Sequence, residues 1–276
     1  MKSNKKVNLF IIGVNKAGSS WLYYLLNNHP QVFMSEVKEQ YYFNEQYPEN
    51  MEKYHANFPF DRDYKYFGEA TPTYYRSGET AQNILEYAPE AKIVAIVRDP
   101  IKRLHSQFYF HKQLGIIPED KTIEEAINEP DTHLIRDSHY EETLPVYQEL
   151  FLDNFKIISL EQALKNMEFC WQELQSFLAL KTVELPELSN KSENATGSSF
   201  FRLIYKYTIR PIKKRSPELY KKLLRMKTMR VSKKILLRIL GKADKEEIPA
   251  NLQKKLKIEF SATYKYLAEL GFDDVY

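Results

Sequence analysis

The sequence predicts an α/β fold in which a central parallel sheet is flanked by helices. Short apolar runs typical of buried strands alternate with segments of helical length through about residue 180. Beyond Pro186 the pattern contains helical segments only, which predicts a helical C-terminal cover. Because 43% of the 276 residues are hydrophobic, the chain can bury a substantial core, and we expect a single domain over residues 1–276.

The expected elements follow in chain order. Residues 8–14 (NLFIIGV) form an apolar strand that ends in a glycine-containing turn. Each later strand is again followed by a helix, and such repeated β-α units give parallel strands. Pro100 suits the first turn of the helix expected at 100–112, because an N–H at that position would have no acceptor within the helix. The other strands are expected at 65–69, 91–97 and 155–159, and the helices at 19–28, 79–87, 100–112, 167–178, 200–209, 217–240 and 250–270.

The composition limits the expected cellular location and the classes of binding partner. Cys170 is the only cysteine, so the chain has no internal disulfide or Cys-rich metal site, and the reducing cytoplasm is the expected location. No run approaches the roughly 18 apolar residues of a membrane span. The net charge of +3 conceals a basic segment, residues 202–245, which contains 16 Lys or Arg and 2 acidic residues. Such a segment favours anionic partners.

A nucleic acid, a membrane surface and an anionic cofactor would each satisfy the basic segment. Within it, Leu219, Leu223 and Leu224 alternate with cations at helical spacing, a pattern that permits contact with an anionic membrane. We expect a weak membrane contact as an added property and no nucleic-acid partner. A non-catalytic anion-binding or membrane-binding module stays an alternative for the whole chain.

The turn after the first strand carries the first functional signal. Residues 16–21 (KAGSSW) place a lysine, a glycine and two hydroxyls before a helix, whose N-terminal N–H groups and dipole attract anions. A plain β-α turn with a capping serine is the alternative. A Walker A loop would carry lysine directly before Ser or Thr, whereas Lys16 precedes Gly18. The order of residues in this turn therefore argues against a P-loop kinase.

Four segments together resemble the PAPS-dependent sulfotransferases, which use 3'-phosphoadenosine 5'-phosphosulfate (PAPS). Residues 16–20 are similar to the family's 5'-phosphosulfate loop K-x-G-T-T, with serines at both threonine positions. Arg-Asp-Pro at 98–100, followed by Ser106, resembles the 3'-phosphate motif. Residues 68–74 (GEATPTY) are similar to G-E-K/A-S/T-P-x-Y, and residues 194–197 (NATG) to the late loop that closes over the nucleotide. The bacterial and heparan sulfate-type branch is the most similar.

This resemblance implies a P-loop-like sulfotransferase fold, PAPS as the donor, PAP as the product and no metal ion. Lys16 would also stabilise charge on the leaving oxygen, which makes it a catalytic candidate. An arginine suits a phosphate because its guanidinium can donate two parallel hydrogen bonds. The nucleotide-binding residues that the resemblance implies are Lys16, Ala17, Gly18, Ser19, Ser20, Trp21, Arg98, Ser106 and Gly197.

A hydroxyl acceptor also needs a base, which is typically worth roughly 10²- to 10⁴-fold in rate. Residues 38–43 (KEQYYF) are similar to the E-x-H-F-F-like motif of the heparan sulfate branch, whose glutamate is the base, so the resemblance assigns Glu39. Tyr41 stands where that branch usually has histidine. His139, before a helix that flanks the acceptor cleft in relatives, is the second candidate. A solvated surface charge is the alternative role for Glu39.

The expected function is transfer of the sulfuryl group from PAPS to a hydroxyl, or to an amine or amide nitrogen, of a small-molecule or natural-product acceptor. A cytosolic oligosaccharide or glycan precursor is the alternative acceptor. The sequence does not distinguish between these acceptors, because none of its motifs is specific for the chemical structure of an acceptor.

Overall fold

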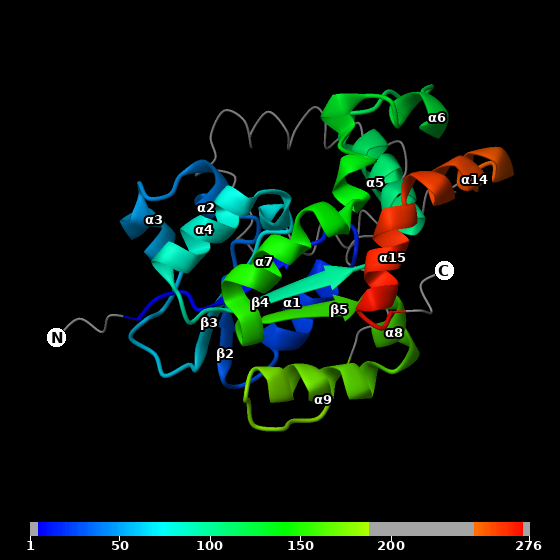
Figure 1. Ribbon diagram of the computed structural model, residues 1–276. Helices are drawn as coiled ribbons and strands as arrows, with labels where there is room; N and C mark the ends of the chain where they lie inside the picture. The colour runs from blue at the N-terminus through cyan, green and yellow to red at the C-terminus, as the bar shows by residue number, and fades with distance from the viewer. Residues whose placement is uncertain (1–4, 188–245, 273–276) are drawn as a thin grey trace. The chain divides into compact units, whose positions relative to one another are not determined.

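The computed structural model describes residues 5–187 and 246–272 (Figure 1). These residues belong to two compact units. The first unit holds 5–103, 137–187 and 258–272, and the second holds 104–136 and 246–257. The single domain expected over residues 1–276 stays a prediction.

The first unit contains a five-stranded sheet with the order β2-β3-β1-β4-β5. All four neighbouring pairs are parallel, so the expected α/β fold class with a parallel sheet is confirmed. Because the strands are parallel, their carboxyl ends meet at one edge of the sheet, where such folds place their ligands. The strands are β1 (Leu9–Gly13), β2 (Val32–Met34), β3 (Tyr66–Ala70), β4 (Lys92–Val97) and β5 (Phe155–Ser159).

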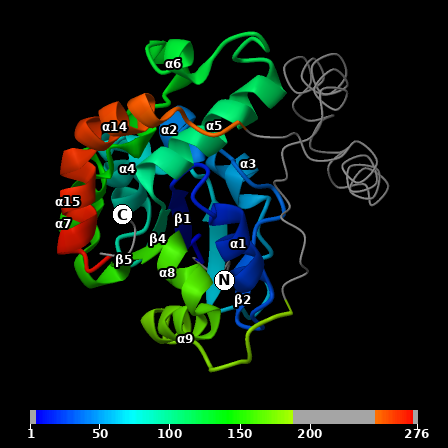
Figure 2. The same ribbon diagram turned by 90° about the vertical axis from the view of Figure 1, so that its right-hand side faces the viewer.

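Helices cover both faces of this sheet. Figures 1 and 2 show α7 (Leu144–Phe151) and α15 (Ser261–Glu269) on one side of the strands and α1 (Ser19–Asn27) on the other. Phe10 of β1 and Ala95 of β4 belong to an aromatic-rich core on one face. Residues of β1 and β4 are buried on both faces, which explains their continuous apolar runs.

The remaining helices of the first unit are α2 (Tyr42–Glu45), α3 (Met51–His55), α4 (Gly78–Tyr87), α8 (Leu160–Lys165) and α9 (Met167–Phe177), with the 3₁₀ turns η1 (Tyr74–Arg76), η4 (Tyr140–Glu142) and η5 (Leu152–Asn154). The second unit contains α6 (Ile123–Ala126) and η2 (Pro130–Thr132). Three elements contribute residues to both units: α5 (Pro100–Leu114), η3 (Arg136–Ser138) and α14 (Ala250–Glu259).

The four expected strands and the expected helices through residue 178 are present, with ends that differ by one or two residues. The single helix expected over 250–270 is wrong, because the segment forms α14 and α15. Phe260 separates them, with backbone angles of φ −92° and ψ 19° and a fully buried side chain. The buried residues Leu256, Phe260 and Tyr264 keep helical spacing through this break, so the sequence pattern predicts one helix although the backbone at Phe260 divides it. The helices expected at 200–209 and 217–240, and the basic segment 202–245, lie outside the described residues.

None of the helices in the described part of the chain combines the length and the apolar character that a membrane span requires.

Candidate active site

The turn between β1 and α1, residues 13–21, is named the anion turn. Gly18, the residue before α1, has a φ of 108°, in the left-handed region that favours glycine. A Cβ at this position would lie 2.9 Å from Leu160 Cδ1 and 3.3 Å from Ile96 Cδ1. The backbone conformation therefore favours glycine here, and a Cβ would also displace the Leu160 and Ile96 side chains.

The start of α1 presents backbone donors at the edge of the sheet. No side chain caps this helix at Gly18, and the first N–H groups of a helix have no acceptor within the helix. Ser19, Ser20 and Trp21 occupy the first turn and are half-buried, as is Lys16. The structure thus places the lysine, both serines and the helix N-terminus in one short turn, an arrangement suited to an anion.

Arg98, directly after β4, contacts the anion turn. Its Nη1 donates a hydrogen bond to the Lys16 carbonyl oxygen at 3.3 Å. Its Nε lies 3.9 Å from Glu161 Oε1, and this buried Nε has no hydrogen-bond partner in the described protein. Burial raises the pKa of the Glu161 carboxyl. Two motifs that are 82 residues apart in the sequence therefore meet at the same edge of the sheet.

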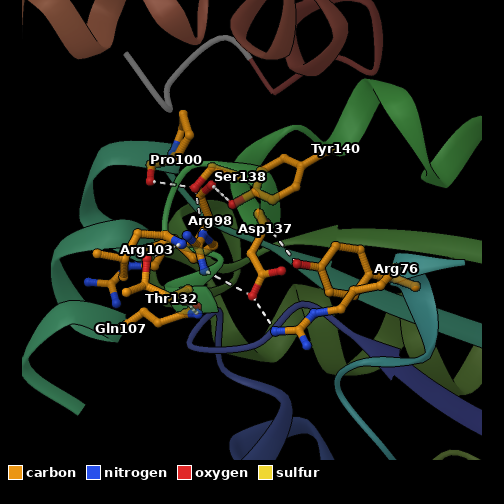
Figure 3. A network of polar contacts seen from close by, with 11 residues as sticks. Arg76, Arg98, Pro100, Arg103, Gln107, Thr132, Asp137, Ser138 and Tyr140 are labelled. Carbon is orange, nitrogen blue, oxygen red and sulfur yellow. Dashed lines mark hydrogen bonds and ion pairs between the residues drawn. The ribbon is translucent and has the colours of Figure 1, made fainter. Parts of the chain in front are cut away.

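A buried polar network supports the end of β4 (Figure 3). The Tyr140 hydroxyl donates to the Arg98 carbonyl oxygen at 2.8 Å. Arg103, which is fully buried, donates through Nε to Ser138 Oγ at 2.6 Å and lies 3.9 Å from the buried Asp137 carboxylate. Buried charges are costly unless they are paired, so these pairings fix the segment after the strand.

Asp99 begins α5. Its Oδ1 accepts a hydrogen bond from Lys102 N at 2.7 Å, which caps the helix, and its Oδ2 accepts one from the Tyr264 hydroxyl at 3.1 Å. Ser106 is half-buried and lies about two turns along the same helix. It belongs to the second unit.

Residues 38–43 form a second functional segment, the carboxylate loop. Lys38 Nζ donates to Ser20 Oγ of the anion turn at 2.8 Å, which joins the two segments. Glu39 has an exposed side chain, and its Oε2 accepts a hydrogen bond from the Tyr41 hydroxyl at 2.8 Å. Burial, together with the charge of Glu39, raises the pKa of the Tyr41 phenol well above its ordinary value. Tyr41 is therefore a neutral donor to this carboxylate.

Lys38 is the residue that sequence analysis missed. It is the first residue of the KEQYYF segment, so a signal was present, but its sequence position does not show that its ammonium reaches Ser20. Lys38 also lies over the Tyr23 ring, 4.8 Å from the centroid. These two contacts place a second positive charge beside the anion turn.

His139 is held between two carboxylates. Nδ1 lies 2.9 Å from Glu141 Oε1 and Nε2 lies 3.2 Å from Glu259 Oε1. Burial by itself would lower the pKa of His139, but the contacts with Glu141 and Glu259 raise it overall. The ring also packs edge-on against Phe260 at 5.3 Å between centroids. These contacts favour a protonated imidazole, which is unsuited to act as a base.

Gly197 lies outside the described residues. Within residues 5–187 and 246–272, no group of three or more His, Cys, Asp or Glu side chains could hold a metal ion.

Parts of the chain are similar to known proteins. The "Membrane-associated sulfotransferase kil1" of Dictyostelium discoideum is 36% identical over 109 residues, which cover 38% of this chain and 23% of that protein. The mouse (Mus musculus) "Heparan sulfate glucosamine 3-O-sulfotransferase 5" is 31% identical over 99 residues, which cover 36% of this chain and 29% of that protein. The chain thus matches less than a third of the length of either relative.

A solved structure, a sulfotransferase from Alicyclobacillus acidocaldarius, is similar over 80% of this chain and 100% of its own, with a TM-score of 0.62 and 21% identity. This similarity confirms the P-loop-like fold that the sequence predicts. The sequence profile described as "Sulfotransferase domain" matches residues 6–231, which is most of the chain. The chain therefore belongs to the sulfotransferase domain family.

Proposed function

We propose that this protein transfers a sulfuryl group from PAPS to an acceptor and releases PAP. The hydrogen bond from Arg98 Nη1 to the Lys16 carbonyl oxygen carries this proposal. It joins the turn proposed for the 5'-phosphosulfate to the arginine proposed for the 3'-phosphate. A nucleotide with anionic groups at both positions needs two such cationic sites close together.

The chemistry of the donors fits an anionic nucleotide. Arg98 Nε and Trp21 Nε1 are buried N–H groups that have no acceptor in the described protein. Buried donors in folded proteins are nearly always paired, so these two are suited to donate hydrogen bonds to a ligand's oxygens or to a solvent molecule. Ser106 and Gly197 stay proposed nucleotide-binding residues on the basis of their sequence motifs.

When bound, PAPS supplies the sulfuryl group. Its S–O bond to the phosphate breaks while a new S–O bond to the acceptor oxygen forms, and the acceptor's proton passes to Glu39. Negative charge develops on the leaving phosphate oxygen, where Lys16 would stabilise it. Lys38, which is bonded to Ser20, would supply a second positive charge.

Glu39 is the better-supported base. Its side chain is exposed to an incoming acceptor, and its carboxylate keeps lone pairs beyond the one that Tyr41 uses. Both ring nitrogens of His139 lie within hydrogen-bond distance of carboxylates. His139 would have to leave Glu259 before it could accept an acceptor's proton.

Nucleotide binding provides the first test. PAP should raise the melting temperature of the protein far more than AMP or ATP at equal concentration, since a ligand that binds only the folded state stabilises it. Equal shifts for the three nucleotides would contradict the assignment of Arg98. Incubation with labelled PAPS and a metabolite extract, followed by mass spectrometry, would then identify the sulfated product.

A small hydroxyl compound is the first acceptor class to test, with an amine or amide nitrogen as a variant of it. The mouse relative favours a second candidate, because its name specifies a glucosamine unit as acceptor. Sulfation of a glucosamine-containing oligosaccharide but of no small compound in the extract would support the glycan acceptor. The opposite result would support the small molecule.

The single cysteine supports a cytoplasmic location, whereas the Dictyostelium relative is named as membrane-associated. Fractionation of cells that express the full chain would decide between these locations. Sedimentation with anionic liposomes, compared with neutral liposomes, would test the weak membrane contact proposed for residues 202–245.

A further inference from the structure

The carboxylate loop has an unfavourable backbone conformation. Glu39 and Tyr41 have φ angles of 56° and 53°, in the left-handed region that residues with a side chain rarely adopt. Such conformations persist only where the surrounding structure holds them, and they gather at functional sites. The candidate base is therefore one of two strained residues in a six-residue segment.

The structure holding this loop comes from the end of β3 and the turn after it. Four backbone N–H groups of the loop donate hydrogen bonds to acceptors within residues 70–74, which are part of the GEATPTY segment. The four hydrogen bonds are Glu39 N to Ala70 O (2.9 Å), Gln40 N to Thr71 Oγ1 (3.1 Å), Tyr42 N to the Tyr74 hydroxyl (3.0 Å) and Phe43 N to the same hydroxyl (3.3 Å).

Two of these acceptors are hydroxyls that a buried carboxylate orients. Glu69 is fully buried, and it accepts a hydrogen bond from Thr71 Oγ1 at 3.1 Å and from the Tyr74 hydroxyl at 3.1 Å. A hydroxyl has one proton, so a hydroxyl that donates to Glu69 turns its lone pairs toward the loop's N–H groups.

The Tyr54 hydroxyl offers a contrast within the same network. It also donates to Glu69 Oε1, at 2.8 Å, and is buried. Among the described residues, the loop's amides donate to Ala70, Thr71 and Tyr74 rather than to this hydroxyl. Tyr54 therefore shares the carboxylate without holding the loop through its hydroxyl.

We propose that Glu69 is a positioning residue for the base: through the hydroxyls of Thr71 and Tyr74 it holds the carboxylate loop in the conformation that presents Glu39. The catalytic part of this inference rests on the proposed function. The positional part does not, because the exchange of the loop's amide hydrogens can be measured without any turnover.

Hydrogen exchange of the full chain, without nucleotide or acceptor, tests the positional part. Thr71→Val and Tyr74→Phe keep the approximate shape and remove one hydroxyl each, while Tyr54→Phe is the matched control. We expect exchange at least about tenfold faster at Gln40 in the first variant and at residues 42–43 in the second, because an amide without its acceptor opens more easily. Glu69→Gln should accelerate all three amides. Tyr54→Phe should change them by less than about twofold.

Two results would overturn the positional assignment. One is equal acceleration in Tyr54→Phe and in the two hydroxyl variants at matched melting temperature, which would mean general destabilisation. The other is a folded Glu69→Gln protein with fully protected loop amides. If Glu69→Gln does not fold, the contrast between Tyr54→Phe and the two hydroxyl variants decides the question.

Kinetics with the acceptor found in the extract test the catalytic part. Thr71→Val and Tyr74→Phe should lower kcat about tenfold or more while the Kd for PAP changes by less than about twofold, because the loop acts on the base and not on the nucleotide. Tyr54→Phe should keep kcat near the wild-type value. Unchanged kcat in both hydroxyl variants would overturn the link to catalysis. A wild-type protein that binds no PAP and transfers no sulfuryl group would instead overturn the proposed function, and the exchange result would still decide the positional assignment.

Discussion

The anion turn and the carboxylate loop lie at the same edge of the sheet but are stabilised in different ways. In the anion turn, two backbone hydrogen bonds join near neighbours in the sequence, from Ala17 N to Val14 O at 3.1 Å and from Trp21 N to Gly18 O at 2.9 Å, while Val14 N donates to Ile96 O of β4 at 2.7 Å. In the carboxylate loop, Gln40 and Tyr42 depend on acceptors more than 30 residues away.

This difference separates two ways of building a site. Both segments contain residues with a side chain at positive φ, Lys16 in the anion turn and Glu39 and Tyr41 in the carboxylate loop. Local hydrogen bonds and Gly18 close part of the anion turn, whereas the amides of Glu39, Gln40, Tyr42 and Phe43 all donate to residues 70–74. We therefore expect changes in the anion turn to act on nucleotide and leaving-group chemistry, and changes at residues 39–43 of the carboxylate loop to act on proton removal.

The largest effect is expected for Glu39→Gln, which keeps the shape of the base and removes its basicity. Turnover should fall by roughly 10²- to 10⁴-fold, the usual contribution of a general base, while PAP affinity stays unchanged. Steady-state kinetics and PAP titration would measure both quantities. Glu36→Gln, a change of the same kind three residues earlier, is the control and should retain kcat. Near-normal turnover in Glu39→Gln together with an inactive His139→Ala would move the base to His139.

Lys16→Ala addresses leaving-group charge in the anion turn. Because this charge develops only in the transition state, kcat should fall by roughly 10²- to 10³-fold, more than PAP affinity does. Single-turnover measurements at saturating PAPS would isolate the chemical step. An unchanged kcat would show that the turn binds the nucleotide without stabilising the leaving group.

Glu69 should make stability depend on pH. Burial raises the pKa of this carboxyl to about 7 from an ordinary 4.5, although the Tyr54, Thr71 and Tyr74 hydroxyls oppose the shift. The folded state thus holds this proton more tightly than the unfolded state. The protonated Glu69 carboxyl therefore contributes fully to the free energy of unfolding below about pH 4.5. This contribution is lost as the pH rises to about 7 and above, which would lower the free energy of unfolding by up to about 3 kcal/mol.

Chemical denaturation at several pH values would measure this slope, with Glu69→Gln as the reference, because glutamine cannot titrate. The neighbouring Tyr54 and Tyr74 phenols have pKa values raised by burial, so they stay neutral throughout the range. Equal slopes in the two proteins would assign the pH dependence to another group.

Arg98→Ala should have the smallest effect on the chemical step. The contact proposed for Arg98 exists equally before and during the reaction, so PAP affinity should weaken by roughly 10- to 100-fold while kcat at saturation changes little. Calorimetric titration with PAP would measure the loss. A large fall in kcat with unchanged affinity would reverse the assigned roles of Arg98 and Lys16.

The sequence alone predicted the α/β class and most of the strands and helices, and its resemblance to the sulfotransferases predicted the segments of the candidate site. Local patterns carry this information. The apolar run of β4 indicates burial on both faces, and the position of Gly18 before a helix indicates a tight turn. The strand β2, three residues long, left no such pattern.

The tertiary structure alone decided which segments meet. The contacts of Lys38 with Ser20, of Arg98 with Lys16, and of His139 with Glu259 join residues 18, 82 and 120 positions apart. The break at Phe260 between α14 and α15 is also absent from the sequence pattern, because the buried residues keep helical spacing through it. Periodicity and spacing report the neighbours of a residue along the chain, whereas hydrogen bonds across a sheet edge depend on how distant segments pack.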